Sequence, residues 1–106
     1  MVTQITPEIR EAIDWYLDGL ARKWDEALDI ITQWNELDPL DQDVFDAEWP
    51  LTIDYLNRLR EYRLQGMLST IQEQQFQKLQ RDMYERRPDL EIVLGQGQVM
   101  LDRLRD

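Results

Sequence analysis

The sequence predicts an all-α fold, an antiparallel bundle of three or four helices built on one long N-terminal helix. Apolar residues recur at every third or fourth position over most of the chain, which is the period of an amphipathic helix. No segment shows the apolar–polar alternation of a half-buried strand. Four Gly and four Pro leave most of the 106 residues free for regular structure. A chain of this length predicts a single domain.

The first helix is predicted over residues 7–37. Thr6 suits the N-cap, Pro7 suits the first helical position, and Glu8 favours the positive end of the helix dipole. Apolar residues then follow in steps of three and four, close to a heptad seam: Ile9, Ile13, Tyr16, Leu20, Trp24, Ala27, Ile31 and Trp34. Such a helix, ended by Pro39, would be about 46 Å long. A helix of that length requires an equally long partner.

Residues 38–50 are predicted to connect this helix to the next. Prolines stand near both ends of the segment, and its carboxylates suit caps and short turns, so we expect at most one short helical turn in it. Near the end of the chain Pro88 marks another boundary. The apolar residues after it predict a final helix over residues 89–105, although Gly95 and Gly97 weaken the pattern in its middle.

Residues 51–87 predict either one bent helix or two helices. Apolar residues spaced by four advance about 40° per step on an ideal helix, so the apolar face drifts too far to remain on one core. Gly66 and Ser69 are the expected kink or break. Ser69, followed three residues later by Gln72, also has the pattern of a capping box.

Charge divides the chain into two unlike halves. Residues 1–54 carry 14 Asp and Glu against 3 Lys and Arg, whereas residues 55–106 carry 8 against 9. The first half therefore has a net charge of −11 and the second +1. The total of −10 opposes binding to nucleic acid or to anionic membranes. The split favours attraction to another protein or to a second copy of the chain.

Composition removes several classes of chemistry. The chain has no Cys and no His, so thiolate nucleophiles, disulfides, zinc fingers and Ser-His triads are excluded. No segment approaches the ~18 apolar residues of a membrane span. The first six residues lack the basic and apolar regions of a signal peptide. We therefore expect a cytoplasmic protein that is not an enzyme and uses no cofactor.

Two features invite a chemical interpretation, and we favour the simpler explanation for each. Lys23 lies in the apolar sector of the first helix, where a desolvated amine can be catalytic. A snorkelling stem or a pair with Glu26 is the commoner outcome. Clustered carboxylates in the connector suggest calcium but lack the glycine and the ligand alternation of an EF-hand loop. They are Asp41, Asp43, Asp46 and Glu48. Capping explains them, so no metal site is expected.

The candidate interaction residues are charged. On a helical projection, five carboxylates of the first helix share the face opposite the apolar seam: Glu11, Asp14, Asp18, Asp25 and Asp29. They form either a docking strip or an ordinary solvated face. Arginines of the second half could pair with such a strip, and the candidates are Arg58, Arg63, Arg81 and Arg86.

These patterns predict a non-catalytic helical protein–protein interaction module that self-associates. The hypothesis is an antiparallel homodimer in which the acidic first helix of one copy meets the arginines of the other. The alternative is an acidic inhibitor that mimics nucleic acid and occupies the basic groove of a DNA- or RNA-binding protein.

Overall fold

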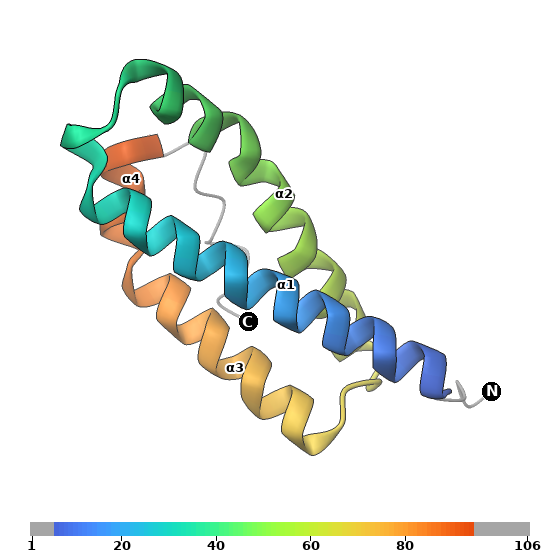
Figure 1. Ribbon diagram of the computed structural model, residues 1–106. Helices are drawn as coiled ribbons and strands as arrows, with labels where there is room; N and C mark the ends of the chain where they lie inside the picture. Colours follow the sequence, from blue (N-terminus) through green and yellow to red (C-terminus); the bar gives the residue numbers. More distant parts are fainter. Residues whose placement is uncertain (1–5, 95–106) are drawn as a thin grey trace.

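The computed structural model describes residues 6–94, which form a bundle of four α-helices (Figure 1). The helices are α1 (Pro7–Thr32), α2 (Pro39–Leu64), α3 (Thr70–Glu85) and α4 (Arg87–Leu94), with a short 3-10 helix η1 (Trp34–Glu36) between α1 and α2. The predicted all-α class and the long first helix are confirmed. α2 runs back along α1, and α3 then runs in the same direction as α1 (Figure 1).

The start of α1 follows the predicted cap chemistry, but its end does not. The Thr6 hydroxyl accepts a hydrogen bond of 3.2 Å from the Ile9 N–H, and proline occupies the first turn. The helix ends at Thr32, not at residue 37. After Thr32 the backbone tightens into η1, and the Trp34 ring packs against Phe45 of α2 with centroids 5.8 Å apart. The α-helix therefore stops before Trp34, and this residue packs against α2 from the 3-10 turn.

The predicted connector 38–50 is wrong, because α2 begins at Pro39. Asp38 is the N-cap, and its Oδ1 accepts a hydrogen bond of 2.9 Å from the Asp41 N–H. Pro39 occupies the first turn, where the N–H that proline lacks has no helical partner in any case. Pro50 lies inside the helix. The helix continues past it because Phe45 and Trp49, one helical turn apart, are both buried in the core. Here core packing outweighs the cost of an internal proline.

The break expected at Gly66 and Ser69 is confirmed, and it separates two helices. Gly66 has a φ of +71°, which glycine adopts without strain. Its N–H bonds to the Arg63 carbonyl at 2.9 Å, and the Met67 N–H bonds to the Tyr62 carbonyl at 3.0 Å, which is the Schellman pattern. The predicted capping box at the start of α3 is also present.

The last predicted helix begins two residues earlier than expected. α4 starts at Arg87, so Pro88 lies within its first turn, where proline is tolerated. Residues 95–105 of the predicted helix, including Gly95 and Gly97, lie outside the described residues.

The core lies around α1, which packs mainly on α2 and also on α3 and α4. α1 and α2 both contain 26 residues, so the long partner that α1 requires is in the same chain. Trp24 of the predicted apolar seam is 3% exposed, which confirms that this part of the seam faces the core, whereas Trp15, outside the seam, is 56% exposed. The bundle measures 51 × 24 × 19 Å. Within residues 6–94, no helix is apolar over a length sufficient to cross a membrane.

Candidate protein-interaction surfaces

The five predicted carboxylates of α1, which we call the acidic strip, all lie on the protein surface. The strip consists of Glu11, Asp14, Asp18, Asp25 and Asp29. One end of it lies beside α3, because Asp14 bonds to Gln72 and Asp18 borders a groove with Gln75 and Lys78. The strip is therefore an exposed flank of the α1–α3 pair, and Asp14 has a structural partner within the chain.

Gln72 is a polar residue that the sequence pattern identified only in part. Its side-chain oxygen accepts a hydrogen bond from the Ser69 N–H at 3.0 Å, which completes the capping box. Its Nε2 also donates to the Arg10 carbonyl at 3.1 Å and to Oδ1 of Asp14 at 2.8 Å. The residue is only 4% exposed. One amide thus caps α3 and attaches it to α1, which local spacing could not reveal.

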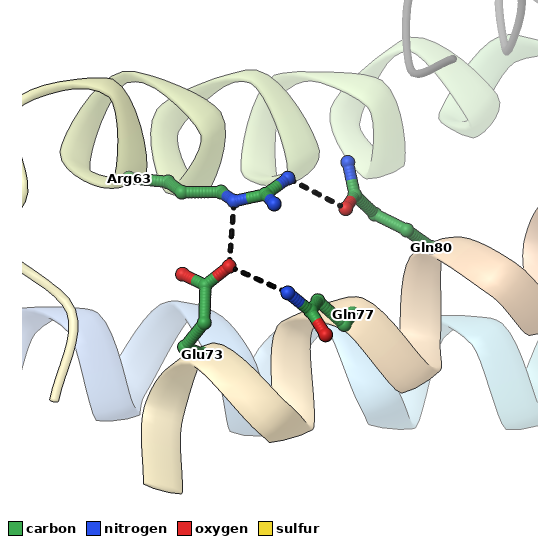
Figure 2. A network of polar contacts seen from close by, with 4 residues as sticks. All are labelled: Arg63, Glu73, Gln77 and Gln80. Carbon is green, nitrogen blue, oxygen red and sulfur yellow. Dashed lines mark hydrogen bonds and ion pairs between the residues drawn. The ribbon is translucent and has the colours of Figure 1, made fainter. Parts of the chain in front are cut away.

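Arg63 is engaged within the chain, between α2 and α3 (Figure 2). Its Nε lies 2.7 Å from Oε1 of Glu73, and its Nη1 donates to Oε1 of Gln80 at 3.3 Å. Gln77 donates to the same Glu73 oxygen at 3.0 Å. The side chains of Arg63 and Glu73 are both about 30% exposed. Arg63 therefore contributes to the bundle itself and is a poor candidate for contact with another copy.

The other predicted arginines differ in their availability. Arg58 is exposed and 4.0 Å from Glu61, whereas Arg86 lies 3.2 Å from Asp89 and bridges α3 to α4. Arg81 is exposed on α3. In the described part of the chain, none of the four arginines forms an ion pair with the acidic strip. Arg58 and Arg81 are the two best placed to meet a partner.

Lys23 lies over an aromatic ring. Its Nζ is 5.3 Å from the centroid of Tyr55, a cation–π arrangement. Of the two predicted outcomes, a snorkelling stem or a pair with Glu26, this contact is closer to the first. Gly19, four residues earlier, allows Tyr55 to approach α1 closely: a Cβ on Gly19 would be 2.6 Å from Cε2 of Tyr55. The Lys23 stem is thus accommodated by packing between α1 and α2, as its position in the apolar sector favoured.

The carboxylates considered for calcium lie on the first turns of α2. A helix spreads Asp41, Asp43, Asp46 and Glu48 over different directions. Among residues 6–94, no group of three potential metal-binding side chains comes together. Asp38, which precedes them, performs the capping.

A surface that the sequence analysis missed lies on the outer face of α2. Leu40, Val44 and Leu51 are 70%, 45% and 51% exposed, and Ala47 between them is exposed as well. Their steps of four, three and four residues place them on one face of the helix, roughly opposite Phe45 and Trp49. We call Leu40, Val44, Ala47 and Leu51 the outer stripe. A connector over residues 38–50 would present no helix face, so the sequence analysis does not predict this stripe.

The outer stripe leads into an aromatic cluster. Tyr55 follows Leu51 by one helical turn, and its ring lies 5.3 Å from those of Trp15 and Tyr16. Trp15 is more than half exposed. Tryptophan and tyrosine are frequent anchors in protein–protein interfaces. The apolar surface of α2 therefore ends at an exposed tryptophan of α1.

The fold and these surfaces define a helical bundle whose charged and apolar faces are both accessible. Comparison with protein-family models, with curated proteins and with solved structures gives no significant match for this chain.

Proposed function

We propose that the chain is a non-catalytic helical module for protein–protein interaction. The observation that carries this proposal is the outer stripe, where large apolar side chains lie exposed on one helix face. Isolated exposed apolar residues are ordinary, but several on one face are typical of an interaction site. The absence of Cys and His from the sequence agrees with a role in binding. A chain without cysteine is also consistent with the cytoplasmic location that we propose.

Site-specific photo-crosslinking tests this proposal. A photoreactive amino acid replaces Leu51 of the outer stripe in one variant and Leu64 in another, and both variants are irradiated in cells of the source organism. Leu64 is a matched control because it lies on the same helix and is 77% exposed, outside the stripe. A discrete adduct with another protein from position 51 and not from position 64 is expected. Equal or absent adducts would contradict an interaction surface on α2.

We propose in addition that the module self-associates through the acidic strip. The strip of one copy would meet Arg58 and Arg81 of another, since Arg63 and Arg86 are held in closer ion pairs, at 2.7 and 3.2 Å, than the 4.0 Å contact of Arg58 with Glu61. The length of α1 no longer supports a dimer, because α2 and the other helices cover it. What supports the proposal is the charge difference between the halves and the exposure of the strip.

A nucleic-acid mimic is the second candidate function. The exposed carboxylates of the acidic strip favour it, because such an inhibitor places negative charges at the positions where its target binds the phosphates of DNA or RNA. A mimic would compete with DNA or RNA for a basic groove, and a competition assay with a nucleic-acid-binding target separates it from an adaptor. Neutralising Asp25 and Asp29 to Asn would abolish inhibition by a mimic and would leave binding at the outer stripe unchanged.

A further inference from the structure

We propose that the outer stripe of α2 binds a cationic amphipathic helix of another protein. This inference rests on the proposed interaction function and specifies the partner. It is carried by three features of the same face: the spacing of its apolar residues, the sign of the charges around them and the aromatic anchor at one end.

The spacing indicates a helix as the occupant. Leu40, Val44, Ala47 and Leu51 occupy alternate d and a positions of a heptad, which is the seam along which two helices pack. The stripe extends for about 17 Å along α2, or three helical turns. A partner helix with apolar residues at the same period would fit against it side by side. Ala47 is small, so it leaves room for a larger side chain of the partner.

The charged residues of α2 that flank the stripe are all negative, and Lys23 of α1, over the Tyr55 ring, lies near its end. Asp41 and Glu48 flank it on one side, Asp43 flanks it on the other, and Asp54 follows Leu51 by one turn. These four residues are exposed. Residues 24–57, which contain the whole stripe, carry ten Asp and Glu and no Lys or Arg. Because flanking charges set partner choice in helix pairs, this surface selects a partner with Lys or Arg beside its apolar seam.

The same charges disfavour the other occupants. A second copy that packed stripe against stripe would bring two sets of carboxylates together, and the positive charges near each stripe are few: Lys23 over Tyr55 and Arg58 beyond the end of the stripe. Nucleic acids and anionic membranes are repelled for the same reason. The cationic helix gains both apolar burial and charge complementarity.

Trp15 provides an anchor at one end of the surface. Its ring packs on Tyr55, one turn beyond Leu51, and remains 56% exposed. A helix lying along α2 past Leu51 would reach this ring. Burial of a tryptophan there would add binding energy and change its fluorescence.

The experiment uses the full chain and two designed helical peptides. Both have about four heptads with Leu at a and d, and the flanking e and g positions are Lys in one and Glu in the other. The chain variants are Leu40→Gln with Leu51→Gln, and, as the matched control, Leu64→Gln with Ile71→Gln. The control residues are 77% and 68% exposed and lie outside the stripe. Binding is followed by fluorescence anisotropy, folding by thermal melts and oligomeric state by sedimentation.

The Lys peptide is expected to bind the native chain and the control variant with affinities within about twofold, and the stripe variant about tenfold more weakly. The Glu peptide is expected not to bind. Equal losses in both variants, or no binding of the Lys peptide, would overturn the inference. The inference would also be overturned if the native chain formed a dimer and only the stripe variant dissociated it. A second copy would then occupy the outer stripe. If position 51 crosslinks to a cellular protein while the Lys peptide fails to bind, the interaction function stands and the cationic-helix inference falls.

Discussion

Nε2 of Gln72 donates a hydrogen bond of 2.8 Å to Oδ1 of Asp14, across the interface between α3 and α1. The sequence pattern assigned these two residues to separate roles, one to a helix cap and the other to an acidic docking strip. The structure joins them, and the contact attaches the start of α3 to α1. The acidic strip is consequently partly structural at this end.

Replacement of Gln72 by Ala should lower the free energy of unfolding by about 2–3 kcal/mol, because a buried hydrogen-bonding side chain and half of a capping box are lost together. Urea denaturation followed by circular dichroism measures this. Gln74→Ala, on the exposed face of the same helix, is the control and should change stability by less than about 0.5 kcal/mol. Similar values for both variants would show that the Gln72 contacts do not stabilise the bundle.

Gly19→Ala should destabilise the protein by about 1–3 kcal/mol, because the new Cβ would lie 2.6 Å from Cε2 of Tyr55. Alanine is otherwise the better helix former by about 1 kcal/mol. In a Tyr55→Ala background the clash is removed, so the same substitution should become stabilising. A change of sign between the two backgrounds is the expected result in denaturant melts. The same sign in both would contradict the close approach of Tyr55.

The two tryptophans of α1 should respond differently to truncation. Trp24 is 3% exposed, so Trp24→Ala should cost about 3–5 kcal/mol. Trp15 is 56% exposed, and Trp15→Ala should cost far less in the isolated monomer. Thermal melts at a concentration where sedimentation shows a monomer make the comparison. Equal losses of stability for the two variants in the monomer would mean that α1 does not turn Trp24 towards the core and Trp15 towards solvent.

The caps show how much of this fold the sequence could predict. Thr6 with Pro7, and Ser69 with Gln72, are local signals, because the interacting groups lie within one helical turn of each other. Pro39 illustrates the limit, since proline suits a first turn as well as a connector, and the choice depends on the buried Phe45 and Trp49 nearby.

Long-range contacts explain most of what the candidate site analysis missed. Gln72 and Asp14 are 58 positions apart, and Arg63 and Gln80 are 17 apart, so no periodicity relates them. The outer stripe did have a local signal, the 4-3-4 spacing of Leu40, Val44, Ala47 and Leu51. That spacing defines a surface only on a helix that begins at Pro39, as α2 does.

The ion pair between Arg63 and Glu73 should contribute about 0.5–1 kcal/mol, as measured by a double-mutant cycle with Ala at each position. Nε of Arg63 and Oε1 of Glu73 are 2.7 Å apart, and both side chains are partly shielded from solvent. Arg58 and Glu61 provide the comparison, since they lie 4.0 Å apart with side chains 64% and 65% exposed. Their coupling should be near zero. Equal coupling in the two pairs would mean that the α2–α3 network adds nothing beyond a surface pair.

Self-association through the acidic strip is the last prediction, and sedimentation equilibrium at low and high salt tests it. At micromolar concentration and low salt we expect a dimer, which weakens as salt screens the attraction between the strip and the exposed arginines. Arg58→Glu with Arg81→Glu should dissociate it, because both cations of the proposed contact are reversed. The double variant Leu40→Gln with Leu51→Gln should leave it intact, since neither residue belongs to the acidic strip of α1 or to the pair of arginines proposed to meet it. A monomer under both salt conditions would exclude the dimer and shift the weight of the proposal towards the nucleic-acid mimic.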